Sequence, residues 1–480
     1  MIKKDDEILK SKEGKQKEVV KASFWYLISN VILKGINFWT VPIFARILTQ
    51  SEYGYFNNFA TWLSIITIVA TINLSTSLPR ARFDFEDDFG NFISSNLLLG
   101  SFSVVCFFLV FLLNKSWLLN IFSLDIKYIY IIFGSLFFLP AFTMFQQVQR
   151  FAYKYKMVIL LTVLTTIGNV IFSFLLIYLM DNNLDARIYG AQLPTFLVSL
   201  GLYGYYLLRF HRFRFSYCKY ALAIAVPYVA HMLANTVLSS IDRTMITSIC
   251  GAEDNALYSM AYNIALILTI LYDSMNSAYA PWLGEQLHAK NYLEIKQYSY
   301  GYILCYGIIV LGVMLIAPEL LWILGGEAYI PAKYVIPPVL LGVFFLFLYS
   351  MYVNIEQYEK KTKGMAIATI IAATLNLVLN YLFIPRYGYV AAAYTTLVGY
   401  IFLFVFHYIL VKKMGFSMVY DSQYIVKISM IMCILTLITT FLYESMVLRF
   451  IFAGIYIFVL LYIGIKNKKN IIKFIKKSDD

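Results

Sequence analysis

Long apolar runs separated by short polar breaks make up most of the chain. A helix needs about 20 apolar residues to cross the hydrocarbon core of a bilayer. On that length the pattern predicts fourteen membrane spans, over residues 22–48, 55–78, 90–113, 127–150, 156–180, 187–209, 220–249, 255–283, 296–318, 333–358, 365–385, 388–411, 423–443 and 446–466. A chain in lipid must pair its own backbone groups, and no barrel-like alternation is present. We therefore predict an all-α polytopic membrane protein.

Basic residues between the predicted spans indicate their orientation. The N-terminal 21 residues, the even-numbered connections with the adjoining span ends, and the C-terminal tail counted from Lys466 hold 29 of the 39 Lys and Arg residues. The odd-numbered connections with their adjoining span ends hold six. Lys and Arg favour the cytoplasmic side of short loops, so both termini are expected in the cytoplasm. Residues 1–21 would form a cytoplasmic arm and residues 467–480 a basic cytoplasmic tail.

The composition agrees with a surface that faces lipid. Charged residues make up 14% of the chain, against about 25% in soluble domains. The net charge of +12 is distributed in short runs rather than one patch, so nucleic acid is not an expected partner. The sequence has no glycine-rich phosphate loop, nucleophile elbow or metal-ligand spacing, so no cofactor is expected.

The second half of the chain repeats polar positions of the first. At an offset of 207 residues, Lys154, Lys156 and Asn169 align with Lys361, Lys363 and Asn376. Six spans in each repeat start from the same side, which predicts two parallel repeats able to rock around a central cavity. The expected parts are an N-terminal six-helix lobe at 22–209, a C-terminal six-helix lobe at 220–411, and two extra helices, 13 and 14, at 423–466.

One short motif resembles a known family. The run Pro42-Ile-Phe-Ala-Arg-Ile-Leu-Thr-Gln-Ser-Glu-Tyr-Gly-Tyr-Phe56 is similar to the first-helix signature of polysaccharide flippases, and Ile241-Asp-Arg243 with Ala256-Leu-Tyr-Ser-Met-Ala-Tyr262 is its second-half counterpart. These flippases belong to the multidrug/oligosaccharidyl-lipid/polysaccharide exporter superfamily, and lipid II flippases look like close relatives. The helix number and the half-to-half symmetry extend the resemblance over the whole chain.

The resemblance implies a function. It implies a transporter that moves an undecaprenyl-diphosphate-linked oligosaccharide from the cytoplasmic to the outer leaflet, for capsule, O-antigen or exopolysaccharide biosynthesis. The expected location is the bacterial cytoplasmic membrane. Expected partners are the lipid-linked oligosaccharide, membrane lipids and polysaccharide assembly proteins. Family members carry basic residues in a central cavity, which suits a diphosphate.

Polar stripes within two predicted spans are the candidate substrate-binding residues, because ionisable groups in a membrane are costly and usually functional. The stripes sit at equivalent positions of the two repeats and consist of Asn30, Lys34 and Asn37 in the first span and of His231, Asn235 and Asp242 in the seventh. Their spacing places each set on one helix face. Lys34 could attract the diphosphate, or it could be a buried helix contact paired with a carboxylate.

Four arginines complete the candidate substrate-binding set. Arg46 and Arg243 lie near helix ends, where they could bind phosphate oxygens bidentately or only anchor the interface. Arg80 and Arg82 follow a proline at a cytoplasmic end, where they could capture the headgroup or only set topology.

Two carboxylates are candidates for ion coupling. Asp273 lies in a polar patch with Asn276 and Ser277 inside a span, and burial would favour its protonated form. A salt bridge from Asp273 to Lys34 or Lys427 is the alternative. Asp242 is the second coupling candidate.

Two other functions stay open. A cation-coupled multidrug antiporter of the same superfamily is the first, although the first six spans hold basic residues and no mid-membrane carboxylate. A membrane polysaccharide polymerase or ligase is the second. Such enzymes need a sizeable outer loop, whereas the longest predicted outer connection is 318–333, so the chain is not expected to be an enzyme.

Overall fold

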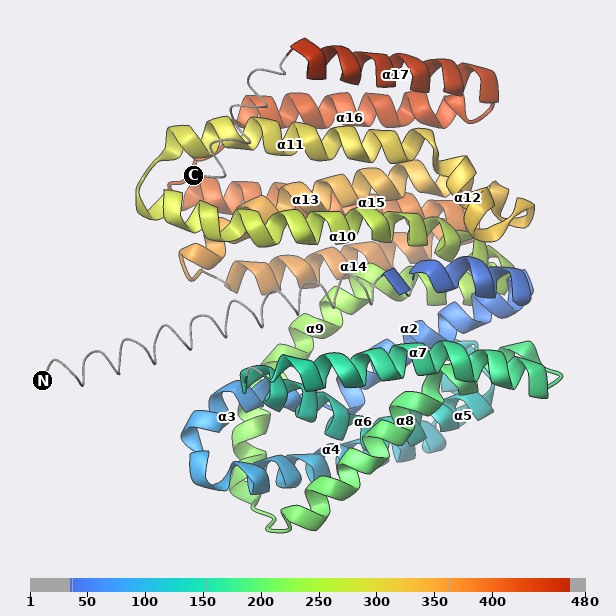
Figure 1. Cartoon of the computed structure of the whole chain (residues 1–480), viewed down its shortest axis with the longest axis vertical. Coiled ribbons are helices and arrows are strands. Elements are labelled where there is room, and N and C mark those ends of the chain that lie inside the picture. The colour runs from blue at the N-terminus through green and yellow to red at the C-terminus, as the bar shows by residue number, and fades with distance from the viewer. Residues whose placement is uncertain (1–34, 37, 153, 362, 467–480) are drawn as a thin grey trace, which may run out of the picture. The chain divides into compact units, whose positions relative to one another are not determined.

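The computed structural model describes residues 35–36, 38–152, 154–361 and 363–466. Within this part every regular element is a helix and no strand occurs (Figure 1), which confirms the all-α prediction. After a helix at Phe38–Ile47, the elements are α2 Gln50–Ala70, η1 Leu74–Ser77, α3 Leu78–Asp84, η2 Glu86–Asp88, α4 Phe89–Leu113, α5 Lys115–Phe122, α6 Ile126–Phe151, α7 Tyr155–Leu179, α8 Asn183–Arg209, α9 Phe215–Ile249, α10 Ala252–His288, α11 Tyr292–Leu315, α12 Ala317–Gly325, η3 Glu327–Val335, α13 Ile336–Tyr358, α14 Lys363–Tyr387, α15 Tyr389–Lys413, α16 Ser422–Leu442 and α17 Met446–Lys466.

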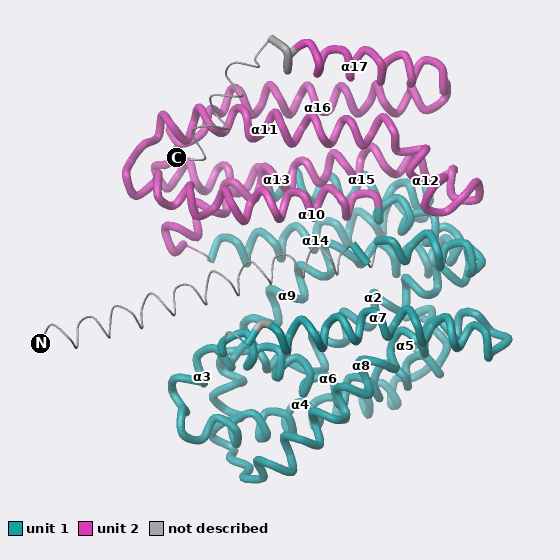
Figure 2. The backbone as a smooth tube through the Cα atoms, in the orientation of Figure 1, with its two compact units in different colours: residues 1–263, 362–403 teal, residues 264–361, 404–480 magenta. Residues whose placement is uncertain are grey.

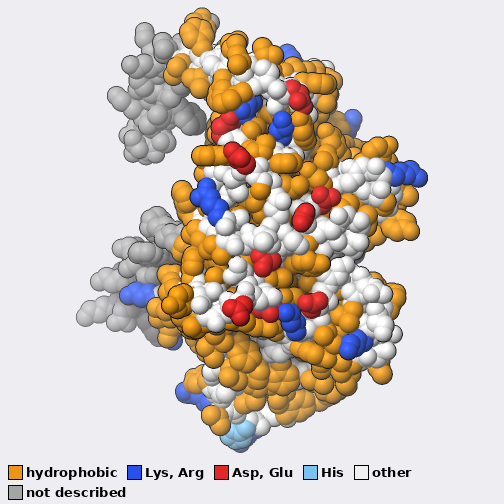
Figure 3. Space-filling model, turned by 90° about the vertical axis from the view of Figure 1, so that its right-hand side faces the viewer, with side chains coloured by type: hydrophobic (Ala, Val, Ile, Leu, Met, Phe, Trp, Pro, Cys, Tyr) orange, Lys and Arg blue, Asp and Glu red, His pale blue; other side chains and the backbone are white. Residues whose placement is uncertain are grey.

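The described helices are long and apolar enough for a polytopic membrane protein. Ten of them pass a length-and-hydropathy test for a membrane span, and eleven pass if α2 and the helical segment Leu74–Asp84, bent by 51°, count as one span. Each of the fourteen predicted spans overlaps a described helix, although the first span is described only from residue 35. On the face in Figure 3, apolar side chains cover large areas and the Lys and Arg side chains are scattered.

Contacts divide the chain into two compact units (Figure 2). Unit 1 consists of residues 1–263 and 362–403, and unit 2 of residues 264–361 and 404–480. These boundaries differ from those of the expected lobes at 22–209 and 220–411, which were drawn from sequence symmetry. The duplication stays a prediction.

The start of α2 explains part of the first-helix motif. Thr49 and Glu52 form a capping box, in which each side chain accepts a hydrogen bond from the other residue's backbone N–H. Gly54 follows one turn inside the helix, where the first turn of α10 comes very close. A Cβ at position 54 would lie 1.7 Å from the carbonyl oxygen of Ala252, so only glycine permits this approach. The Asn255 amide donates to the Gly54 carbonyl at 2.9 Å and fixes the contact.

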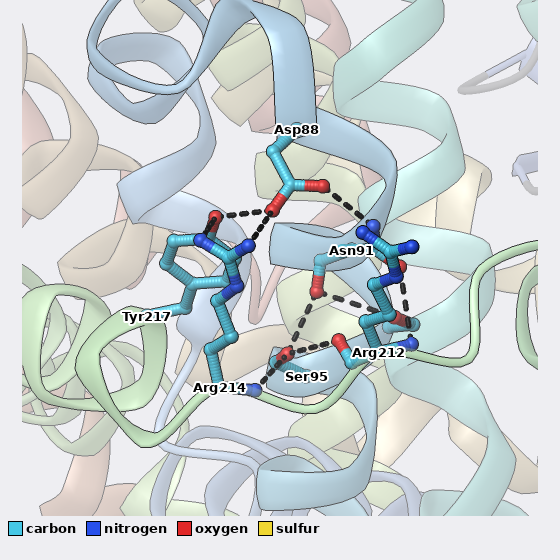
Figure 4. Close-up of polar contacts among 7 residues, drawn as sticks. Asp88, Asn91, Ser95, Arg212, Arg214 and Tyr217 are labelled. Atoms are coloured by element: carbon cyan, nitrogen blue, oxygen red, sulfur yellow. Dashed lines mark hydrogen bonds and ion pairs between the residues drawn. The ribbon is translucent and has the colours of Figure 1, made fainter.

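A polar junction in unit 1 holds the connection between α8 and α9 against α4 (Figure 4). The Tyr217 hydroxyl and the Asn91 amide both donate to the Asp88 carboxylate at 2.5 Å, and the Arg214 guanidinium lies 3.5 Å from it. The backbone N–H groups of Arg212 and Arg214 donate to the side chains of Asn91 and Ser95. The linker is therefore fixed by its backbone as well as by its charges.

Unit 2 is organised around α13, the most buried of its long helices. Near the end of α13, the Glu356 carboxylate lies 2.5 Å from Nδ1 of His407 on α15, and both side chains are fully buried. The Arg449 guanidinium on α17 donates to the Glu319 carboxylate on α12. These contacts give partners to polar groups that would be costly to leave unpaired inside a membrane protein.

The close approach at Gly54 generates a stability prediction. We expect Gly54→Ala to lower the melting temperature of the purified protein, because the added methyl group overlaps the Ala252 carbonyl and overpacking costs about 1–3 kcal/mol. Thermal unfolding in detergent measures the shift. Gly201→Ala in α8 is the matched control, since no atom lies within 4 Å of its added Cβ. Equal melting temperatures for the two variants would contradict the role given to Gly54.

Candidate functional site

An uncharged polar cavity of about 570 Å³ lies within unit 1. Its walls come from α2, α6, α7, α8, α9 and the turn after α2. Of the eighteen described residues that line it, ten are Ser, Thr, Asn or Gln, and none is Asp, Glu, Lys, Arg or His. A smaller cavity of about 260 Å³ shares Ser135, Gln192 and Phe196 with it. A space this polar inside an apolar helical bundle is a candidate binding site.

Several polar groups of the cavity wall are available to a ligand. The side chains of Ser64, Ser135, Gln192 and Thr195 make no hydrogen bond to any other residue in the part of the chain that the structure describes. By contrast, Thr67 and Ser199 donate to carbonyls of their own helices. The four unpartnered side chains therefore give the cavity free donors and acceptors.

Two prolines increase the polarity of this region. Pro140 lies inside α6 and Pro194 inside α8. Proline has no backbone N–H, so the carbonyls of Leu136 and Gly190 lose their helical donors. Leu136 lines the cavity. Such gaps in helical bonding are tolerated at membrane depth where they face protein or a cavity.

Arg187 on α8 is a buried cation bonded to Asn169 of the cavity wall, and in the sequence it is the first residue of the predicted span 187–209. Its guanidinium donates to Asn169 and Ser173 of α7 at 2.7 Å and lies over the rings of Phe44 and Phe56, at 3.8 and 4.5 Å from their centroids. No carboxylate of the described residues forms an ion pair with it. Cation–π contact and neutral acceptors hold the charge in place of a salt bridge.

Asp242 on α9 forms the centre of a second polar cluster in unit 1. Its side chain is 1% exposed. Its carboxylate accepts hydrogen bonds from Tyr258 at 2.5 Å, Asn380 at 2.6 Å and Thr396 at 2.6 Å. These residues lie on α10, α14 and α15, so one carboxylate joins four helices. All three donors are neutral, and within the described residues no basic side chain forms an ion pair with Asp242.

The cluster continues on α14 and α15. Asn376 donates to the Thr396 hydroxyl at 3.0 Å, Asn380 donates to the Asn376 carbonyl oxygen at 3.2 Å, and Thr395 donates to the Asn380 carbonyl oxygen. One carboxylate, two amide oxygens and two hydroxyls thus lie together. Oxygen groups of this kind suit a hard cation, and the carboxylate can also take a proton.

The other predicted residues of the seventh span lie on α9. His231 is half-buried and its Nε2 lies 3.2 Å from the exposed Asn235 amide. Arg243 is half-buried, with its guanidinium 5.3 Å from the centre of the Tyr262 ring. The structure therefore brings His231 to Asn235, and places Asp242 in a separate, buried cluster.

Most of the candidate substrate-binding residues predicted in the first span are not among the residues that the structure describes. Asn30, Lys34 and Asn37 lie outside the described residues. Arg46 is exposed near the end of the helix Phe38–Ile47. Whether Lys34 and its neighbours face a shared cavity stays a prediction.

The two arginines of α3 and the coupling candidate Asp273 are exposed or half-buried. Arg80 is largely exposed and lies 3.6 Å from Asp84, and Arg82 is half-buried. Asp273 is half-buried on α10 in unit 2, where its carbonyl accepts a bond from the Ser277 hydroxyl. Asn276 accepts a bond from Asn354 at 2.8 Å. The polar patch of Asp273, Asn276 and Ser277 stays a prediction.

The cavity and Arg187 are the features that sequence reasoning missed. Asn169 and Ser173, which accept the bonds from Arg187, are four residues apart on α7. That spacing puts them on one face and was the available signal. The cavity residues come from five helices, so no single helix shows their convergence.

Two proteins are similar to the chain in sequence over most of its length. The chain is 24% identical over 371 residues to the Lsg locus putative protein 1 of Haemophilus influenzae, covering 75% of this chain and 89% of that protein. It is 23% identical over 524 aligned positions to an uncharacterized membrane protein of Methanocaldococcus jannaschii, covering 96% and 99%.

Solved structures of transporters are similar to the chain in fold. The inward closed conformation of lipid II flippase MurJ matches with a TM-score of 0.67 and 15% identity, covering 92% of this chain and all of that one. An inward-facing multidrug resistance MATE family transporter matches with a TM-score of 0.60 and 16% identity, covering 81% and 94%. The chain thus has the fold that these flippases and antiporters share.

Family models identify the chain. The MatE model matches residues 227–382. The model described as "Polysaccharide biosynthesis protein" matches residues 19–287, more than half of the chain. The chain therefore belongs to the polysaccharide biosynthesis protein family.

Proposed function

We propose that the chain flips an undecaprenyl-diphosphate-linked oligosaccharide repeat unit from the cytoplasmic to the outer leaflet by alternating access. The observation that carries this proposal is the cavity of unit 1, where none of the lining residues that the structure describes is charged. An oligosaccharide offers many hydroxyls and no positive charge, so a neutral polar wall suits it. Membership of the polysaccharide biosynthesis protein family supports the same substrate class.

Shielding is the physical task of such a transporter. Uncharged polar groups cost several kcal/mol each when moved into hydrocarbon without hydrogen bonds, at roughly 4–8 on alkane scales. A saccharide with several hydroxyls therefore cannot cross lipid at a useful rate unless protein groups replace its water. The unpartnered side chains of Ser64, Ser135, Gln192 and Thr195 offer such replacements.

The basic candidates keep their proposed role at the diphosphate. Lys34, Arg46 and Arg243 would attract the phosphate oxygens. The polar neighbours of these basic residues would assist: Asn30, Asn37, His231 and Asn235. Arg80 and Arg82 would meet the headgroup on the cytoplasmic side. Each negative charge moved outward across an inside-negative membrane gains about 2.3 kcal/mol per 100 mV, so the membrane potential aids export.

Asp242 is the proposed ion-coupling residue, with Asp273 as the second candidate. A proton or a monovalent cation at Asp242 would change which oxygens receive the bonds from Tyr258, Asn380 and Thr396. Because these donors lie on three helices that pack around α9, occupancy of one carboxylate would bias the packing of four helices. A coupling ion shifts the equilibrium between two conformations only if it binds one of them more tightly than the other.

The setting of the protein follows from this function. We place the chain in the bacterial cytoplasmic membrane with both termini in the cytoplasm. Membrane lipids surround it, and polysaccharide assembly proteins receive its product. It carries out transport rather than catalysis.

A cation-coupled multidrug antiporter is the second candidate, favoured by the MatE match over residues 227–382. The uncharged cavity counts against it, because a cationic drug inside a membrane protein needs a carboxylate to balance its charge. Asp242, a buried carboxylate of unit 1, is not among the described residues that line the cavity.

Reconstitution tests the two functions directly. We expect purified protein in liposomes to move undecaprenyl-diphosphate-linked oligosaccharide between leaflets, measured as access of the glycan to an external lectin. Protein-free liposomes give the background rate. We expect no accumulation or efflux of the cationic dye ethidium. Dye transport without glycolipid transport would establish the antiporter instead.

Asp242→Asn tests the coupling role. The amide cannot take a proton or balance a cation, so we expect an imposed H⁺ or Na⁺ gradient to accelerate flipping less, by about 5- to 150-fold, the range of typical coupling energies. Parallel H⁺ and Na⁺ gradients identify the ion. Asp87→Asn is the control, because Asp87 is exposed. The gradient should accelerate flipping by this variant as much as it does for the unchanged protein. A folded Asp242→Asn protein with a full gradient response would rule out the role of Asp242.

A further inference from the structure

We propose that the uncharged cavity of unit 1 is a glycan subsite, which holds sugar residues of the substrate while the diphosphate binds elsewhere. This inference rests on the proposed function and deepens it. The subsite is defined by Ser64 on α2, Ser135 on α6, and Gln192 and Thr195 on α8. Three separate helices thus present free polar groups to one space.

The chemistry of the wall excludes the diphosphate and fits a sugar. A diphosphate in a dry site needs Lys or Arg to balance its charge, and neither residue type is among the described residues that line the cavity. A sugar hydroxyl both donates and accepts a hydrogen bond. Serine and threonine hydroxyls and the glutamine amide also do both, so they can pair with hydroxyls in several orientations.

The size and the apolar part of the wall agree with a saccharide. The volume of about 570 Å³ falls in the range of about 300–1,000 Å³ that is usual for small-molecule sites. Phe196 lines both this cavity and the adjoining one of about 260 Å³. Its ring offers an apolar surface to the C–H face of a pyranose, and the adjoining cavity extends the available space.

The absence of charge from the wall has a measurable consequence. Salt screens interactions between charged groups and leaves neutral hydrogen bonds nearly unchanged. The part of the affinity that depends on the glycan should therefore be insensitive to ionic strength. Binding of the diphosphate part should weaken as salt rises.

Binding to the full-length protein in lipid nanodiscs tests the subsite. One probe is the lipid-linked oligosaccharide extracted from cells that lack this chain, and the other is undecaprenyl diphosphate without sugar. We expect the unchanged protein to bind the first probe more tightly. In Gln192→Met/Thr195→Val this preference should fall by about 10-fold or more, the loss of one to two hydrogen bonds, with the sugar-free probe bound as before.

Gln147→Met is the matched control, because Gln147 is half-buried on α6 and does not line the cavity. It should keep the full preference. If the double variant does not fold, Ser64→Ala/Ser135→Ala replaces it with the same expected loss.

The remaining outcomes of the binding experiment overturn either the glycan subsite alone or the proposed function with it. An unchanged preference in the folded double variant, or an equal loss of both probes, overturns the glycan subsite. Equal binding of both probes by the unchanged protein does so too, while leaving the flippase proposal intact. Failure of the unchanged protein to bind either probe removes the proposed function and the subsite together.

Discussion

The interior of this protein is governed by one constraint, that polar groups removed from water must find partners within the chain. Asp242 meets it with three neutral donors from three helices. Arg187 meets it with an amide, a hydroxyl and two aromatic rings around its guanidinium, although its buried Nε has no hydrogen-bond partner among the described residues. The Asp242 cluster and the Arg187 cluster each require several helices at fixed positions. These polar groups therefore specify one packing of the helices, which a uniformly apolar interior would define less well.

Four side chains around the cavity differ from these clusters, because they have no hydrogen-bond partner among the described residues. Ser64, Ser135, Gln192 and Thr195 lie on the same helices as Thr61, Thr143 and Ser199, whose hydroxyls donate to carbonyls of their own helices. Leaving them open costs stability unless water or a ligand completes their hydrogen bonds. Function is the usual reason for such a local exception to good packing.

The sequence predicted the helices well because their length is set by the bilayer. The predicted span 423–443 compares with α16 at Ser422–Leu442, and 127–150 compares with α6 at Ile126–Phe151. The short helices α5 and α12 were not predicted, because eight or nine residues carry too little periodic signal. Arg187 was not singled out as a candidate, because it lies at the edge of the predicted span 187–209.

The candidate site was predictable only where it depended on one helix. Asp242 was found because it interrupts an apolar span, but Asn380 and Thr396 are separated from it by 138 and 154 residues. Spacing rules act over one or two turns and cannot reveal such partners. The cavity is harder still, because single Ser and Thr residues are common in membrane helices and become a site only where several helices converge.

Helix α9 joins the two features of unit 1 and explains how an ion could act on a substrate. Thr236 lines the cavity and Asp242 lies six residues further on, about 9 Å along the axis at 1.5 Å per residue. A helix transmits a shift over that distance because its backbone bonds keep it rigid. α9 also packs on α2, which supplies several residues of the cavity wall. On the proposed function, a change in the bonds at Asp242 would move α9 relative to α2, and so alter the cavity that holds the glycan. The ion and the saccharide would then compete or cooperate through the position of one helix, without sharing a single contact.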